Sequence, residues 1–169
     1  AHSNFETQLQ SFKAGAFDYL VKPFDRDIIF HKVQSVLELR KRYKDYLKKQ
    51  FVQEPNSVFT QSPEDKFLMS IHKVLEKNYS DSSFSVEKFS SEMGYSRSQF
   101  FRKLKAVIDT TPVEYLKLFR LRKAKEMLET GKWSVSDVAY DVGFNDPKYF
   151  SICFKEQYGQ APNVFIKRA

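Results

Sequence analysis

The chain has 169 residues, of which 41% are hydrophobic, enough to bury one good core or two small ones. Its apolar runs are too short for a membrane span, no signal-peptide pattern opens it, and its single cysteine, Cys153, excludes an internal disulfide, so we expect a cytoplasmic protein. The net charge is +7. The segment from Arg97 to Lys132 contains ten Lys and Arg residues but only four Asp and Glu residues, and such clustered positive charge is typical of nucleic-acid binding.

The first fifty residues predict a helix, a strand and a long helix. A short amphipathic stretch at residues 4–14 precedes Phe17–Val21, whose aromatic and branched side chains favour a strand. Residues 22–25 (KPFD) end that strand and cap a helix that continues to about residue 50. Residues 51–62 show no clear periodicity, so we expect a linker there.

Residues 63–169 carry repeated signals for helix starts and helix ends. Serine, threonine or asparagine followed by proline, or by an acidic or amide side chain, predicts a start, and glycine predicts an end. We therefore expect an all-helical region of about seven helices. The starts lie near residues 62, 96, 111, 134 and 145, and the ends at Gly94, Gly131, Gly143 and Gly159.

Two segments of this region repeat each other. Residues 84–95 and 133–144 align at an offset of 49, and the offset becomes 50 beyond the shared glycine. Each copy predicts an apolar-faced helix, a tight turn at the glycine and a second apolar-faced helix, which is a helix-turn-helix. A single copy is also compatible with a helical hairpin that binds nothing, but two copies favour a pair of DNA-binding units at 85–108 and 134–158.

The second helix of each unit carries a polar face opposite its apolar face. Arginine there suits guanine and lysine suits phosphate, so we expect both helices to enter the major groove of double-stranded DNA. For each residue alone, the alternative is a solvated surface side chain. The predicted DNA-binding residues are Arg97, Ser98, Gln99, Arg102, Lys103 and Lys105 in the first unit, and Lys148, Tyr149, Ile152 and Lys155 in the second.

A basic helix at residues 112–130 is predicted to connect the two units. Lys117 and Arg120 fall within its apolar arc; for Arg120 we expect a structural salt bridge, with a phosphate contact as the alternative. A rigid connection of this length would hold the two recognition helices about one DNA turn apart, ~34 Å. The apolar arc is formed by Val113, Leu116, Leu121, Ala124, Met127 and Leu128.

Residues 63–169 resemble the C-terminal DNA-binding domain of the AraC/XylS family of bacterial transcription regulators. The most specific part is VSDVAYDVGFNDPKYFSICFKEQYGQAP (135–162), and GYSRSQFFRKLK (94–105) and RLRKAKEML (120–128) are also similar. The resemblance implies a mostly α, tandem helix-turn-helix fold and a sequence-specific transcription regulator. It also implies DNA contacts from Ser98, Arg102, Lys148, Tyr149 and position 152, where Ile152 stands in place of the arginine frequent in the family.

Residues 1–50 resemble the last third of a response-regulator receiver domain, through GAFDYLVKPF (15–24). The resemblance implies that Lys22 is the lysine that contacts the phosphoryl group, Pro23 a cis-proline and Tyr19 the switch aromatic. The phosphate-accepting aspartate would lie upstream, so we expect a C-terminal fragment of a longer protein. Receiver and AraC-type domains follow each other in response regulators and in hybrid two-component sensors of gut Bacteroidetes, which often control polysaccharide utilisation; the SPEDKFL segment resembles the hybrid class more.

The remaining expectations concern partners and chemistry. His2, His31 and His72 lie far apart and no glycine-rich phosphate loop is present, so we expect no metal, no cofactor and no enzyme activity. We expect no membrane contact, and a homodimer through residues 1–50. The alternative function is a protein-interaction module that docks acidic partners on its basic helical faces. The apolar residues expected to drive the dimer are Ile29, Val33, Val36 and Leu37.

Overall fold

The structure, a computed structural model, describes residues 22–53 and 62–166 and the isolated positions 10, 13, 16 and 20. It divides into two compact units, residues 1–43 and residues 44–169. The expected strand at Phe17–Val21, Leu20 excepted, lies outside the described residues, as do Tyr19 and most of the expected linker.

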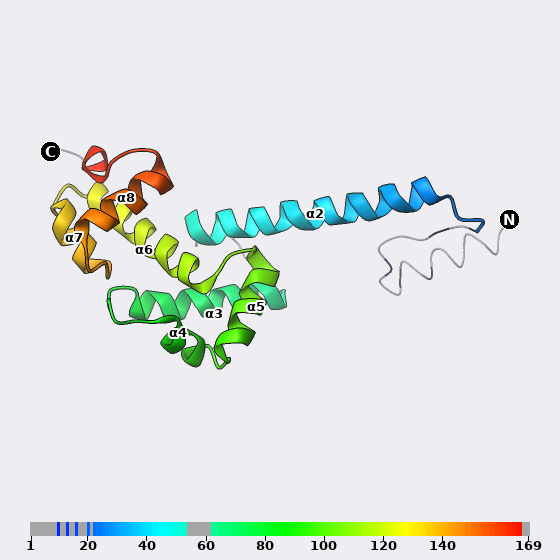
Figure 1. The fold of residues 1–169 in the computed structure, drawn as a ribbon, viewed down its shortest axis with the longest axis horizontal. Coiled ribbons are helices and arrows are strands. Elements are labelled where there is room, and N and C mark those ends of the chain that lie inside the picture. Colours follow the sequence, from blue (N-terminus) through cyan, green and yellow to red (C-terminus); the bar gives the residue numbers. More distant parts are fainter. Residues whose placement is uncertain are drawn as a thin grey trace. The chain divides into compact units, whose positions relative to one another are not determined.

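The regular elements of the described residues are α-helices and one 3-10 helix, with no strand among them (Figure 1). This confirms the mostly α fold, and residues 63–165 hold six α-helices and the 3-10 helix. The elements are α2 (Arg26–Gln53), α3 (Pro63–Asn78), α4 (Val86–Glu92), α5 (Arg97–Ile108), α6 (Pro112–Glu129), α7 (Val135–Asp141), α8 (Pro147–Tyr158) and η1 (Pro162–Phe165).

Helix α2 begins where the sequence predicts. The Asp25 carboxylate accepts hydrogen bonds from the backbone N–H groups of Asp27 and Ile28, and the Lys22–Pro23 peptide bond is cis, as the receiver resemblance implies. The helix ends at Gln53, so residues 51–53, which were expected in the linker, are helical. Among the described residues, no helix has the length and apolar character needed to cross a bilayer.

The repeat in the sequence is a repeat in the structure. Helices α4 and α7 begin 49 residues apart, and α5 and α8 begin 50 residues apart. The turn glycines, Gly94 and Gly143, have φ values of +73° and +86°, which a side chain at Cβ disfavours. The predicted caps Ser62, Ser96, Thr111 and Ser134 all accept backbone hydrogen bonds, and at the start predicted near residue 145 the cap is Asp146.

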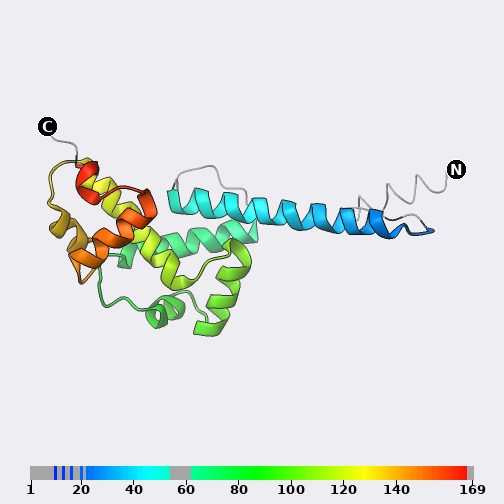
Figure 2. The same cartoon turned by 45° about the horizontal axis from the view of Figure 1, so that its top comes forward.

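Helix α6 is shared by two separate cores, and it runs from α5 to the α7–α8 pair (Figures 1 and 2). Its first half packs into a core with α3, α4 and α5, and its second half into a core with α7 and α8. The predicted single arc was therefore partly wrong. Val113 is 61% exposed, whereas Tyr115, Leu118, Phe119 and Arg122, outside the predicted arc, are buried.

Candidate nucleic-acid interface

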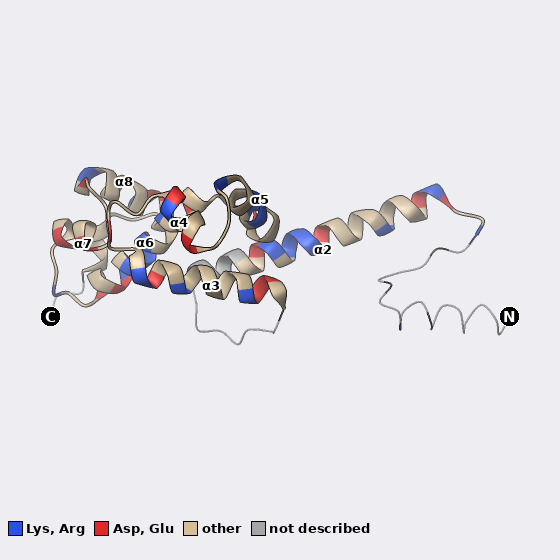
Figure 3. Cartoon of the chain, turned by 90° about the horizontal axis from the view of Figure 1, so that it is seen from below, with Lys and Arg blue, Asp and Glu red and all other residues tan. Residues whose placement is uncertain are grey.

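Helices α5 and α8 each bury one side and expose the other. Phe100 and Leu104 of α5 are buried in the first core, and Phe150 and Phe154 of α8 occupy the same places in the second. The ten predicted DNA-binding residues are all exposed on the opposite sides. Figure 3 shows α5 and α8 at the same edge of the unit formed by residues 44–169, with Lys and Arg on both helices.

Arg102 lies at the centre of the exposed face of α5. Its Nε donates a long hydrogen bond of 3.4 Å to the carbonyl of Ser98, one turn earlier, and no carboxylate of the described residues lies within ion-pair distance. The planar fork of its guanidinium is therefore available to an external acceptor pair, such as the N7 and O6 atoms of guanine. The Ser96–Gln99 capping box holds the start of this helix in place.

The other basic residues of α5 already have partners within the chain. Arg97 pairs with Glu87 at 2.9 Å and Lys105 with Asp109 at 3.1 Å. Exposed pairs of this kind contribute about 0–1 kcal/mol, so either cation can exchange its carboxylate for a phosphate.

Lys103 is held differently from these two residues. Its Nζ lies 2.5 Å from the hydroxyl of Tyr95 and 4.6 Å and 4.7 Å from the ring centroids of Phe67 and Tyr95. The ammonium group thus lies near two aromatic rings of its own domain, and this cation–π contact ties α5 to Phe67 of α3 and to Tyr95 of the turn before it.

Helix α8 presents a mixed face. Lys148 and Lys155 are exposed and have no ion-pair partner among the described residues. Between them Ile152 is 57% exposed, which confirms that an apolar side chain stands at the centre of this face. A hydrogen bond with Cys153 raises the pKa of the exposed Tyr149 phenol, while Cys153 itself is buried, as expected.

Arg120 has a structural role, but the expected salt bridge is wrong. The guanidinium donates to the backbone carbonyls of Tyr79, at 2.8 Å, and Asp81, at 2.7 Å, and no carboxylate of the described residues lies within ion-pair distance. A second arginine, Arg122, is buried between Glu76 and Glu126, at 3.8 Å and 3.6 Å. Sequence periodicity did not single out Arg122, because it lies outside the predicted apolar arc of α6, where a charged residue is most often exposed.

These features define a class of protein. Two helix-turn-helix units related by an internal repeat, joined by one helix and exposing a basic second helix at a common edge, form a tandem helix-turn-helix DNA-binding domain.

Comparisons with known proteins agree with this class. Residues 89–168 match the family model described as "Helix-turn-helix domain", which is of AraC type. The chain is 32% identical, over 168 residues and 99% of its length, to "Histidine kinase P4" of Formosa agariphila, and it spans 12% of the length of that relative. Residues 89–168 therefore form a helix-turn-helix domain of AraC type.

Two solved structures share the fold, and each is more than 25% identical in sequence over the part that matches. The C-terminal domain of the two-component response regulator yesN from Fusobacterium nucleatum is 29% identical, with a TM-score of 0.53, and the match covers 57% of this chain and 94% of that one. The DNA-binding domain of AdpA, a global transcriptional factor solved in complex with a target DNA, is 27% identical, with a TM-score of 0.53 and coverages of 59% and 87%.

Proposed function

We propose that this chain recognises a specific DNA site with both units, by placing α5 and α8 in successive segments of the major groove. The observation that carries the proposal is the pairing of a fully buried face with an exposed basic face on both helices, at one edge of the domain. The crystal structure of the AdpA domain with its target DNA supports the same use of this fold. Basic side chains at that edge supply the salt-dependent attraction to phosphates.

The proposal assigns different roles to the exposed residues. Arg102 reads a base pair, because its guanidinium is not engaged by a carboxylate of the described residues. Lys148 and Lys155 contact phosphates. Arg97 and Lys105 contact phosphates after exchanging their carboxylate partners. The remaining proposed contacts are Ser98, Gln99, Lys103, Tyr149 and Ile152.

Selection of bound sites from a random duplex library tests the proposal. Arg102→Ala is expected to cost about 1–3 kcal/mol at one base position, because the lost contact is specific to one base. Lys155→Ala is expected to weaken all sites alike and to lower the slope of log K against log salt by about one unit. Lys73→Ala, on the exposed side of α3, is the charge-matched control and should change neither quantity.

A chain that bound single strands or acidic proteins as well as duplex DNA would contradict the proposal and favour the protein-interaction alternative. If Arg102→Ala behaved like Lys155→Ala, the assignment of Arg102 as the base-reading residue would be wrong.

We further propose that the chain is the cytoplasmic output region of a two-component protein that controls polysaccharide-utilisation genes. Its support is the match of nearly the whole chain to a protein named a histidine kinase and the likeness to a response-regulator domain. In this proposal residues 1–50 belong to a receiver domain, with Tyr19 and Lys22 at its switch positions, 51–62 form a linker and 63–169 bind DNA. Chromatin immunoprecipitation should then enrich promoters of such genes, and enrichment confined to unrelated promoters would contradict it.

A further inference from the structure

Three elements of the DNA-binding domain meet at one joint. Tyr79 is the C-cap of α3, which shares a core with the first helix-turn-helix, so that the first unit together with α3 and the loop after it spans residues 63–108. Arg120 lies at the middle of the connecting helix α6, and Gly143 is the turn glycine of the second unit. The carbonyl of Tyr79 accepts a hydrogen bond from Arg120 Nε, and a Cβ atom placed on Gly143 would lie 2.5 Å from that same carbonyl oxygen and 2.9 Å from Arg120 Nη2. The joint therefore brings the backbones of the two units into direct contact around one guanidinium.

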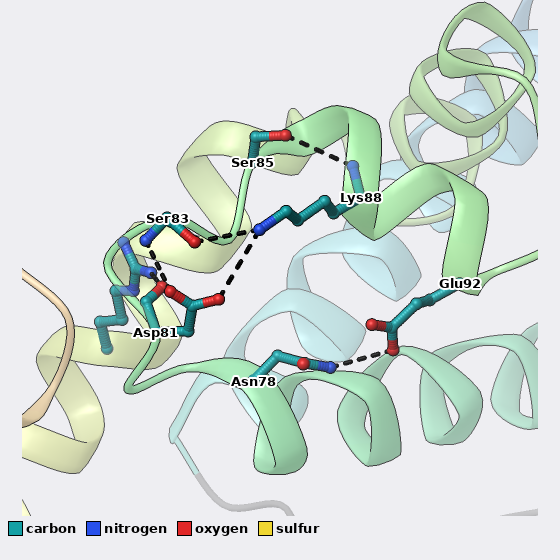
Figure 4. A network of polar contacts seen from close by, with 7 residues as sticks. Asn78, Asp81, Ser83, Ser85, Lys88 and Glu92 are labelled. Carbon is teal, nitrogen blue, oxygen red and sulfur yellow. Dashed lines mark hydrogen bonds and ion pairs between the residues drawn. The ribbon is translucent and has the colours of Figure 1, made fainter.

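The first-unit side of the joint is anchored. The Tyr79 side chain packs against both cores, with its ring 5.9 Å from that of Phe119. Beyond Tyr79, the loop is tied to α4 by Lys88, whose ammonium donates to the Ser83 hydroxyl at 3.0 Å and lies 3.9 Å from Asp81 (Figure 4). The two carbonyls that Arg120 holds thus belong to a segment that moves with the first unit.

On the second-unit side of the joint, Gly143 packs closely against Tyr79 and Arg120, and the turn itself does not require this contact. Gly94 has nearly the same backbone conformation as Gly143, but a Cβ atom there would meet no atom within 4 Å. The repeat therefore separates the two effects: positive φ serves the turn in both units, and the tight contact exists only where the second unit meets the first.

A hollow of about 510 Å³ opens beside the joint. It is lined by Ser82 from the first unit, by Val113, Lys117 and Arg120 from α6, and by residues 143–146 and Tyr149 from the second unit. The space beside Arg120 is thus not filled by side chains, so that the guanidinium and the close contact at Gly143, rather than a packed core, link the two units on this side of α6.

We propose that Arg120 is a positioning residue that fixes the angle between the two units and thereby the spacing of the two half-sites that the chain accepts. The inference rests on the proposed two-unit recognition of DNA. Insertion of one base pair moves a half-site by about 3.4 Å and rotates it by roughly 35°. A clamped domain cannot follow this change without breaking contacts, whereas a domain without the clamp follows it by turning α8 relative to α5.

A phosphate contact by Arg120 is the rival role, and the geometry argues against it. The side chain is partly buried, and two of its donor groups are already used by carbonyls. Burial lowers the pKa of the guanidinium, and the nearby Asp81 raises it in part. The two roles differ in their salt dependence, since only a phosphate contact releases a counterion on binding.

The test uses the complete 169-residue chain and a duplex site that it selects from a random library, together with versions of that site carrying one base pair more or fewer between the half-sites. The variants are Arg120→Met, which removes the donors, and Arg120→Lys, which keeps the charge but not the fork. Lys117→Met, three residues away on the same helix and beside the same hollow, is the control. A thermal melt reports whether each variant is folded.

Wild type and Lys117→Met are expected to prefer the selected spacing by about tenfold or more. Arg120→Met and Arg120→Lys should reduce this preference to about threefold or less, with an unchanged salt slope and unchanged binding to random duplex. Two outcomes would overturn the inference and leave the proposed function intact. One is a preference for the selected spacing in folded Arg120→Lys that is as large as in wild type. The other is a salt slope that is reduced by about one unit in Arg120→Met. A wild-type chain without site-specific binding would overturn both.

Discussion

At the two turn glycines, one backbone conformation meets two different surroundings. Gly94→Ala places a Cβ atom in open space at positive φ and should lower the free energy of unfolding by about 1–2 kcal/mol. Gly143→Ala adds a collision with the Tyr79 carbonyl and should cost at least about 1 kcal/mol more. Denaturant titration of the two variants measures the difference. Equal losses of free energy of unfolding would contradict the prediction, because they would mean that the atoms around Gly143 move aside at little cost.

Tyr115 buries a hydroxyl group for which the described part of the chain supplies no hydrogen-bond partner. Since an unsatisfied buried hydroxyl costs free energy, Tyr115→Phe should raise the free energy of unfolding by about 1 kcal/mol at neutral pH. A loss of stability of the same size would show that the hydroxyl is bound to water.

Tyr115 also predicts a dependence of stability on alkaline pH. Burial raises the pKa of its phenol in the folded chain above the ordinary value of about 10. The unfolded chain therefore releases this proton first, so that stability is unaffected below about pH 10 and falls as the pH rises above it. Tyr115→Phe should make this fall shallower, while Tyr158, whose pKa is raised to about 12 by burial, keeps part of it in both proteins.

Among the elements, the two recognition helices carry different chemistry at equivalent places. Arg102 of α5 offers forked donors, whereas Ile152 of α8 offers methyl groups, whose partner in the major groove is the C5-methyl of thymine. We predict that the half-site under residues 97–105 prefers G·C pairs at its centre and that the half-site under 147–155 prefers A·T pairs.

Replacement of the central thymine by uracil isolates the methyl contact in the second half-site. Wild type should bind the uracil site about three- to fourfold more weakly, the equivalent of ~0.8 kcal/mol for one buried methyl group. Ile152→Ala should bind both sites equally. Equal losses in the two proteins, or no loss in either, would leave Ile152 without a reading role.

The elements also differ in how far the sequence predicted them. Each half of the repeat was predicted with its turn and its two helices, because Ser85, Ser134, Gly94 and Gly143 act through local backbone conformation. The buried faces of α6 were predicted less well. The first half of the helix buries one side in the first core and the second half buries a different side in the second core, so a single apolar stripe does not describe the whole helix.

For the whole molecule, we predict a homodimer through the N-terminal residues. Of the residues expected to drive the dimer, Val33, Val36 and Leu37 of α2 are exposed and Ile29 is partly buried. Phe30 is exposed beside them, and exposed apolar side chains in such number favour association. Sedimentation at increasing concentration should show a monomer–dimer equilibrium for wild type. A Val33→Lys, Leu37→Lys variant should remain monomeric, and a wild-type monomer at all concentrations would contradict the prediction.

The sequence alone determined the helical class, the two-unit repeat and the exposed basic faces, since caps, turn glycines and helical periodicity act over a few neighbouring residues. Only the tertiary structure decided which basic residues are already engaged, because Lys103 meets Phe67 and Arg97 meets Glu87 from other elements. It also decided the role of Arg120, whose carbonyl partners lie 41 and 39 residues away. Backbone carbonyls occur at every residue and leave no mark in the sequence, so a contact with them becomes visible only when the chain is folded.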